Sequence, residues 1–226
     1  MTVLFDLDGT ISDSSAGILK SVKLGLDHFG QDHYTLDELR VFIGPPLRDM
    51  FPNFGVPEDK VDEAIRVFRE YYNVKGKYEN TPYDGIEDML KKLKDDGIPM
   101  CIATSKPEKT SIDIIKHFGF TDYFAMICGA TFDESRESKQ QVLEYLMHQC
   151  DDSDFLMIGD TQYDVIGANS LGIKTIGVSW GFGTIEEMEA AGAVAIAHTP
   201  EELYNLIHQY SEKYNKGEET EWNIEH

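Results

Sequence analysis

The sequence predicts an α/β fold: a Rossmann-like, doubly wound parallel sheet with an inserted helical-bundle domain. Short apolar runs rich in β-branched or bulky residues alternate along the chain with segments of helical periodicity, which is typical of strands and helices that follow one another in sequence. The apolar runs are continuous, as expected of strands covered by helices on both faces. One long helical block, directly after the first run, interrupts this alternation and predicts the inserted domain.

The predicted elements follow from these runs and from the glycines between them. Strands are expected at residues 2–5, 98–103, 126–128, 155–158 and 175–178, with a weaker one at 194–197. Helices are expected at 85–96, 107–118, 138–150, 162–171 and 186–191. Gly97, Gly119 and Gly172 each lie just past a periodic segment, where a left-handed residue commonly ends a helix.

The interrupting block contains no convincing strand. Apolar residues recur at helical spacing in two stretches, at Ile18, Val22, Leu26 and Phe29 and at Val61, Ile65, Phe68 and Tyr72. We therefore expect a core domain formed by residues 1–13 and 83–211, a helical cap domain at 14–82, and an acidic tail at 212–226.

The formal net charge of −21 over 226 residues limits the partners of this protein. Binding to nucleic acid polymers or to anionic membranes requires a basic surface, so both are disfavoured. An anionic substrate would also meet a repulsive average field. A phosphate-binding site in this chain therefore needs local positive charge from lysines, helix N-termini or a metal ion.

We expect a cytoplasmic protein. No apolar run approaches the roughly 18 residues needed to cross a bilayer, and the first residues lead directly into an aspartate rather than forming a signal sequence. Cys101, Cys128 and Cys150 are odd in number and widely spaced, so they resemble neither a disulfide framework nor a zinc site. Cys101 and Cys128 lie in apolar runs, as buried core cysteines do.

Two carboxylates follow the first predicted strand, in the segment Asp6-Leu7-Asp8-Gly9-Thr10. Ligands of open parallel sheets bind beyond the carboxyl ends of the strands. There, one aspartate can attack phosphorus as a nucleophile while the other protonates the leaving oxygen, and Gly9 lets the backbone approach a phosphate closely. An ordinary Asp-rich turn remains an alternative.

The second predicted strand is followed by Thr104-Ser105-Lys106-Pro107. Pro107 suits the first turn of a helix, and the amides just before it would then point outward as an anion site. The Thr104 hydroxyl can donate to a phosphate oxygen. A plain helix cap explains the segment equally well.

Lys139 follows Ser138 at the start of a predicted helix, where Ser138 and Gln141 form a capping box. A cation at a helix N-terminus opposes the helix dipole. Lys139 is therefore an unusual choice for a solvent-exposed position, although exposed lysines are common.

Two further aspartates follow the strand at 155–158. Asp160 ends the strand without an obvious turn role, whereas Asp164 lies in the first turn of the next helix and can also complete a capping pattern with Thr161. Aspartates crowded at one sheet edge would repel and become protonated unless a cation neutralised them. Oxygen ligands favour Mg²⁺, and Mg²⁺ with Lys139 would supply the missing positive charge.

In order and in placement, these segments resemble the four motifs of the haloacid dehalogenase superfamily. The segment 6–10 resembles the first motif, Thr104 the second, Lys139 the third, and Gly159-Asp160 with Asp164 the fourth. The helical insert after the first motif is similar to the cap of the phosphoglycolate phosphatase-like group. The resemblance covers nearly the whole chain and implies the fold predicted above.

The resemblance also implies catalytic roles. Asp6 would form an aspartyl-phosphate, and Asp8 would act as general acid and then as general base for the hydrolytic water. Lys139 would neutralise charge between Asp6 and the phosphate. The implied phosphate-binding residues are Gly9, Thr10, Thr104, Ser105 and Lys139. The implied magnesium ligands are Asp6, Asp8 through its main-chain carbonyl, Asp160 and Asp164. Asp164 would support the metal through water or would orient Lys139.

In that family the cap helps to choose the leaving group. The segment 44–48, Gly-Pro-Pro-Leu-Arg, is a candidate substrate loop in which Arg48 offers a charge to an anionic substrate. A surface arginine at a helix start is an equally good interpretation. Tyr83, at the second crossing between the domains, is either a hinge packing residue or a wall of the pocket.

The leading functional interpretation is a magnesium-dependent phosphatase acting on a small phosphorylated metabolite, such as phosphoglycolate or a nucleoside monophosphate. The alternative is a β-phosphoglucomutase-like phosphomutase, which shares the core, Asp6 and Asp8 but retains the phosphoryl group. A receiver-like signalling domain is disfavoured, because its nucleophile resides on a later strand and it has no cap insertion. We expect a monomer or a weak homodimer.

Overall fold

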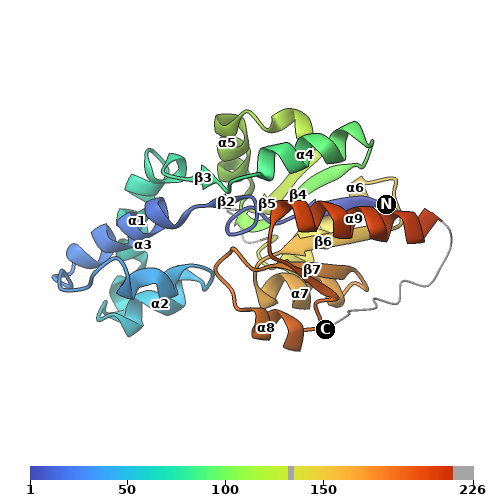
Figure 1. Cartoon of the computed structure of the whole chain (residues 1–226). Coiled ribbons are helices and arrows are strands. Elements are labelled where there is room, and N and C mark those ends of the chain that lie inside the picture. The colour runs from blue at the N-terminus through green and yellow to red at the C-terminus, as the bar shows by residue number, and fades with distance from the viewer. Residues whose placement is uncertain (132–134, 216–226) are drawn as a thin grey trace. The chain divides into compact units, whose positions relative to one another are not determined.

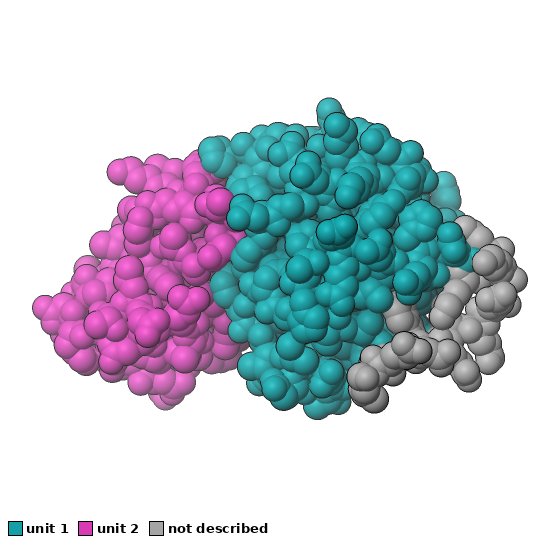
Figure 2. Space-filling view, viewed as in Figure 1, with its two compact units in different colours: residues 1–12, 82–226 teal, residues 13–81 magenta. Residues whose placement is uncertain are grey.

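The computed structural model describes residues 1–131 and 135–215. The chain forms two compact units (Figures 1 and 2). The core unit comprises Met1–Ser12 and the chain from Pro82 onward, and the insert unit comprises Asp13–Thr81. Of the predicted acidic tail, residues 212–215 form the end of the last helix, and 216–226 lie outside the described residues.

The core unit contains a six-stranded parallel sheet with the strand order β5-β4-β1-β6-β7-β8. The order runs outward from β1 in both directions, which confirms the predicted doubly wound topology. The strands are β1 (Thr2–Phe5), β4 (Met100–Pro107), β5 (Met126–Ala130), β6 (Phe155–Gly159), β7 (Lys174–Val178) and β8 (Ala195–Ala197).

The sheet is buried on both faces because successive side chains of each strand point to opposite sides. On β1, Val3 and Phe5 belong to one hydrophobic cluster, and Leu4 between them belongs to another. The same alternation occurs on β6, where Leu156 joins the first cluster and Met157 the second. This double burial explains why the strands are continuous apolar runs.

Helices cover the two faces (Figure 1). Buried side chains of α4, α5 and α9 complete the first cluster, and those of α6 and α7 complete the second. The helices are α4 (Ile86–Asp95), α5 (Glu108–Phe118), α6 (Lys139–Gln149), α7 (Gln162–Asn169), α8 (Ile185–Ala190) and α9 (Pro200–Asn215), with a 3₁₀ turn η4 (Thr121–Tyr123). The predicted left-handed glycines at 97, 119 and 172 have φ of 73°, 75° and 73°.

Two features of the core unit differ from the sequence prediction. Strand β4 continues through Thr104-Ser105-Lys106 to Pro107, and Pro107 caps α5 instead of forming its first turn. This extension is possible because the pairing of β4 with β5 shifts register between Ala103 and Pro107. Helix α9 was not predicted, although Pro200 at its first position and a buried stripe at Leu203, Ile207 and Tyr210 are helix signals.

The insert unit is helical, as its sequence periodicity predicts. It contains α1 (Ser15–Asp27), α2 (Leu47–Asn53) and α3 (Val61–Tyr72) with 3₁₀ turns η1 (Glu38–Phe42), η2 (Glu58–Lys60) and η3 (Gly76–Tyr78). Its own core includes Val22, Leu26, Ile65, Phe68 and Tyr72. The chain crossings carry two short paired strands that were not predicted, β2 (Ser12–Asp13) and β3 (Thr81–Pro82).

Within residues 1–131 and 135–215, none of the helices combines the length and the apolar character that crossing a bilayer would require.

Candidate active site

The carboxyl ends of three neighbouring strands bring the predicted site residues together. Asp6 directly follows β1, Thr104 lies near the end of β4, and Asp160 directly follows β6. Because β1 pairs with both β4 and β6, these positions are adjacent although they are up to about 150 residues apart in sequence. Lys139 and Asp164 enter the same edge from the first turns of α6 and α7.

Lys139 is the central cation of the site. Its buried ammonium lies 2.9 Å from Asp6 Oδ1 and 2.7 Å from Asp164 Oδ1, and it donates a 2.8 Å hydrogen bond to the Ala103 carbonyl. Burial disfavours the charged ammonium, but the Asp164 and Asp6 carboxylates outweigh this effect and raise the pKa of Lys139. The predicted capping box of Ser138 and Gln141 is present and begins the helix that carries the lysine.

Asp6, Asp160 and Asp164 form a carboxylate triad in which one oxygen of each lies within 4.8 Å of the others. Burial, followed by the charges of Asp164 and Asp6, raises the pKa of Asp160 well above its ordinary value. Burial also raises the pKa of Asp164, although Lys139 opposes that shift. One lysine therefore does not compensate the triad when all three carboxylates are ionised.

The triad fits a hard divalent cation. It offers only oxygen ligands, at least two of them from buried residues. The raised pKa values of Asp160 and Asp164 show that ionising these two carboxylates is unfavourable without additional positive charge. Mg²⁺ is commonly held by a few carboxylates together with water and substrate phosphate oxygens. Asp6, Asp160 and Asp164 are accordingly the residues that would hold it.

Asp160 is fixed by several groups around it. Its Oδ1 accepts a 3.1 Å hydrogen bond from the Thr10 hydroxyl, and its Oδ2 accepts a 2.8 Å bond from the Phe182 amide. Gly9, with φ of 82°, and Gly181 both press their backbones against this carboxylate, and a Cβ at either glycine would overlap it. The phosphate contact predicted for Thr10 remains a prediction, because here its hydroxyl orients Asp160.

Asp164 combines the two roles that the sequence left open. Its Oδ2 accepts hydrogen bonds from the Thr161 amide and hydroxyl, at 3.1 and 2.9 Å, and so caps α7. Its Oδ1 pairs with Lys139. The cap therefore orients the carboxylate that holds the lysine.

Asp8 forms an ion pair with Lys106 that the sequence analysis did not predict. The Lys106 side chain is nearly buried, with 7% relative exposure, and comes from the extended end of β4. The signal was present in the sequence: the strongly acidic chain required local positive charge, and Lys106 stands two residues after Thr104. Lys106 is thus a second cation at the carboxyl edge of the sheet.

Thr104 and Ser105 directly precede Lys106 at the end of β4. The Thr104 side chain is buried and its hydroxyl oxygen accepts a 3.2 Å hydrogen bond from the Lys106 amide, whereas Ser105 is exposed. They occupy the strand end where the sequence placed them, and their contacts with phosphate stay predictions.

A second unpredicted contribution comes from the segment after β7. Trp180 donates a 3.1 Å hydrogen bond from its indole N–H to the Thr10 carbonyl, and its ring packs edge-on against Tyr83. Tyr83 therefore contributes packing within the core unit. Gly181 and Gly183 in this segment follow a strand end and were the sequence signal that its backbone closely approaches another group, here Asp160.

Arg48 belongs to the insert unit, whereas the cluster described above belongs to the core unit. It lies in the first turn of α2, is largely exposed and pairs with Asp62 of the same unit. This is the contact of a surface arginine at a helix start, and the predicted substrate contact stays a prediction.

The family model described as haloacid dehalogenase-like hydrolase matches residues 3–178. The chain belongs to this family. It is 39% identical to a 5'-nucleotidase of Pseudomonas aeruginosa over 195 residues, which cover 83% of this chain and 86% of the relative.

Two further relatives span most of this haloacid dehalogenase-like chain. It is 36% identical to the tyrosine-protein kinase PtkA of Mycobacterium bovis, over 87% of this chain and 68% of the relative. The crystal structure of a predicted phosphatase from Clostridium acetobutylicum superposes with a TM-score of 0.85 at 42% identity, covering 92% of this chain and 98% of the other. Relatives and neighbouring structures together support a hydrolase of the phosphatase type.

Asp160→Asn should stabilise the metal-free protein at alkaline pH. Because the pKa of Asp160 is raised in the folded protein, stability is lost as the pH rises from the ordinary aspartate pKa through the raised one. The amide side chain of the Asp160→Asn variant does not ionise, so this loss of stability is absent. We expect the unfolding temperature at pH 8 in EDTA to exceed that of the unsubstituted protein by about 3 °C, or about 1 kcal/mol, with the difference shrinking toward pH 5.

Added magnesium should then make the unsubstituted protein more stable than Asp160→Asn. It should raise the unfolding temperature of the unsubstituted protein and of the exposed control Asp122→Asn, but not that of Asp160→Asn. Equal stabilisation of all three by magnesium would exclude Asp160 as a ligand.

Lys106→Met should lower kcat/KM for phosphate release about tenfold to a hundredfold, because it removes a nearly buried cation that holds Asp8. Steady-state kinetics on p-nitrophenyl phosphate would measure the loss, with Lys106→Arg retaining more activity than Lys106→Met. Lys109→Met, on the exposed side of α5, is the matched control and should leave the kinetics unchanged. Equal kinetics for both Met variants would contradict a role for Lys106.

Proposed function

We propose that this chain is a magnesium-dependent phosphatase that hydrolyses small phosphomonoesters, with nucleoside monophosphates as the first candidates and phosphoglycolate as the second. The observation that carries the proposal is the contact of Lys139 with both Asp6 and Asp164 inside a buried carboxylate triad. The preference for nucleotides is supported by the 39% identical relative named 5'-nucleotidase.

In this proposal Asp6 is the nucleophile. Its carboxylate lies at the end of a central strand, where Lys139 pairs with it and can neutralise charge as the carboxylate attacks phosphorus. The P–O bond to the leaving group breaks as the aspartyl-phosphate forms. Lys139 also offsets the negative charge of the incoming phosphoryl group, which the net charge of −21 would otherwise repel.

Asp8 serves as the general acid and base. It stands two residues after the nucleophile, where it can protonate the leaving oxygen and then deprotonate the water that attacks the aspartyl-phosphate. The ion pair with Lys106 holds this carboxylate in place before substrate binds. Asp8 must gain a proton before it acts as an acid, so substrate binding has to loosen that ion pair.

The phosphoryl oxygens would be held by groups at the two strand ends, namely the Gly9 and Thr10 backbone, the Thr104 hydroxyl and the Ser105 amide. Bound Mg²⁺ would supply charge neutralisation between the aspartates and the phosphate. Asp160 and Asp164 remain fixed during turnover, because the Thr10, Phe182 and Thr161 hydrogen bonds restrain them.

Asp6→Asn should reduce phosphate release by at least about a thousandfold, since an amide is not a nucleophile for phosphorus. The substitution preserves side-chain shape, so the far-ultraviolet circular dichroism spectrum should be unchanged. Phosphate release near the normal rate by the folded variant would exclude Asp6 as the nucleophile.

A phosphate-release screen over nucleoside monophosphates, sugar phosphates and phosphoglycolate tests the substrate class and the metal together. We expect release with magnesium, loss of release in excess EDTA, and recovery on adding magnesium back. Full activity in EDTA would contradict the metal assignment. Isomerisation of a sugar phosphate without phosphate release would instead indicate a phosphomutase.

A further inference from the structure

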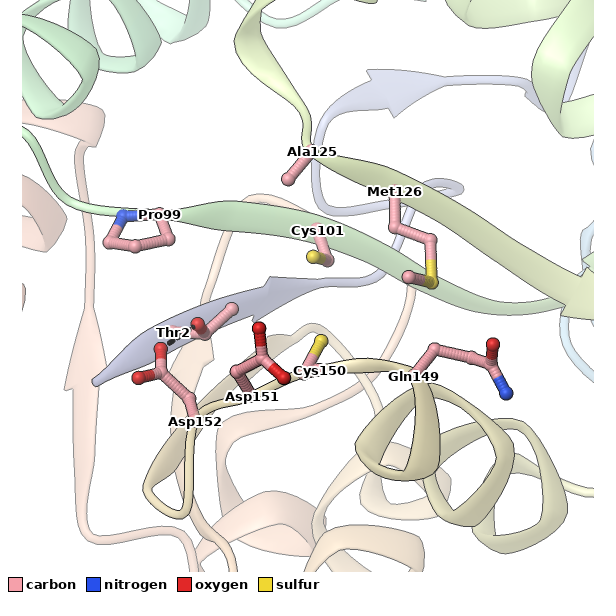
Figure 3. Close-up of a pocket in the computed structure, with 9 residues that line it drawn as sticks. All are labelled: Thr2, Pro99, Cys101, Ala125, Met126, Gln149, Cys150, Asp151 and Asp152. Atoms are coloured by element: carbon pink, nitrogen blue, oxygen red, sulfur yellow. Dashed lines mark hydrogen bonds between the residues drawn. The ribbon is translucent and has the colours of Figure 1, made fainter.

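A pocket of about 310 Å³ lies at the amino-terminal ends of the strands, at the opposite edge of the sheet from the carboxylate triad (Figure 3). It is formed entirely within the core unit, where β1, β4 and β5 begin and where α6 ends. The lining residues are Thr2, Pro99, Cys101, Ala125, Met126, Gln149, Cys150, Asp151 and Asp152. None of them takes part in the proposed phosphatase chemistry.

Two of the three cysteines meet in this pocket. Cys101 lies on β4, and Cys150 follows the last residue of α6 with its sulfur pointing toward Cys101 (Figure 3). The two thiols are close enough for each to shift the pKa of the other. Cys101 is buried and Cys150 is partly exposed, so a small reagent that enters the pocket reaches Cys150 first.

The third cysteine, Cys128, does not belong to this pocket. Cys128 lies on β5 in the same hydrophobic cluster as Cys101, but it is buried and does not line the pocket. The pocket therefore gives a reagent access to the Cys101–Cys150 pair and not to Cys128.

We propose that Cys101 and Cys150 are a modification site, a dithiol that hydrogen peroxide oxidises to an intramolecular disulfide. The Cys150 thiolate attacks one peroxide oxygen, the O–O bond breaks, and hydroxide leaves as Cys150 becomes a sulfenic acid. Cys101 then attacks the Cys150 sulfur, forms the S–S bond and releases water. Both thiols are oxidised, and one peroxide is reduced to two molecules of water.

The charge around the pocket selects among oxidants. Asp151 and Asp152 follow Cys150 and line the pocket. The terminal ammonium of Met1 lies 3.8 Å from Asp152 and partly offsets its charge, which leaves Asp151 as the main local charge. Because the chain as a whole is also strongly acidic, anionic disulfides such as glutathione disulfide are repelled. Hydrogen peroxide is neutral and small enough to enter. A cationic disulfide such as cystamine should be attracted to the same thiol.

The thiols react slowly at neutral pH. Burial raises the pKa of Cys101 to about 12, and burial together with Asp152 and Asp151 raises the pKa of Cys150. Because the thiolate is the reacting form, oxidation should accelerate as pH rises. The site therefore responds to sustained rather than brief exposure to peroxide.

The cross-link would join β4 to α6. These elements also meet at the other edge of the sheet, where Lys139 of α6 donates to the Ala103 carbonyl of β4. The two side chains already line one pocket, and the Cys150 sulfur points toward Cys101 (Figure 3). We therefore expect the bond to form without moving that edge, and turnover to be retained. It closes a loop of about 50 residues in the unfolded chain, which raises the unfolding temperature.

The test compares the full chain with Cys150→Ser and with Cys128→Ala before and after hydrogen peroxide. In the folded, unsubstituted protein we expect the thiol count to fall from three to one, with a mass loss of about 2 Da from two hydrogens and a peptide cross-link between Cys101 and Cys150. Cys128→Ala should fall from two thiols to none. Cys150→Ser should form no disulfide within the chain.

Two further readouts follow from the charge and the cross-link. The oxidised protein should unfold at least about 4 °C higher, reversibly with dithiothreitol. Cystamine should modify Cys150 at least about fivefold faster than glutathione disulfide, and Asp151→Asn should reduce that ratio. A Cys101–Cys128 cross-link, a Cys150-linked dimer, or Cys150 oxidised only to sulfinic acid would overturn the proposal. None of these results depends on which phosphate ester is the substrate.

Discussion

The organisation of the core unit depends on one buried cation between carboxylates. Lys139 contacts Asp6 from β1 and Asp164 from α7 while its own helix, α6, begins at Ser138. Three elements therefore share one ionic contact. Removing one partner from such a buried group costs about 3–5 kcal/mol, because the remaining charges lose their compensation. The catalytic arrangement is thus also a structural one, and catalysis and folding constrain the same residues.

Close backbone approach makes this arrangement possible. Asp160 sits between Gly9 and Gly181, from segments that follow β1 and β7, and both lack the Cβ that would overlap its carboxylate. The hydrogen bonds from Thr10 and Phe182 then fix the orientation of the Asp160 carboxylate. The glycines thus allow a carboxylate with an unfavourable charge to be placed where a cation can compensate it, instead of turning toward solvent.

Local sequence signals predicted the scaffold and most of the site, because periodicity and motif spacing are local properties. The continuous run at residues 2–5 and the aspartates beyond it needed no knowledge of distant residues. Lys106 was missed for the opposite reason: its pairing with Asp8 depends on the register shift that lets β4 continue to Pro107. The contribution of Trp180 likewise depends on a contact with Thr10 across 170 positions.

The two edges of the sheet separate two kinds of chemistry. At the carboxyl ends, backbone amides, helix N-termini and two lysines gather around aspartates, which favours anionic ligands. At the amino ends, Cys101 and Cys150 line one pocket together with the acidic side chains of Asp151 and Asp152, and this charge disfavours anionic ligands. Strand β4 and helix α6 run between both edges, so the same two elements carry the thiols at one edge and Lys106 and Lys139 at the other. A parallel sheet makes this separation unavoidable, because all of its strands end on the same side.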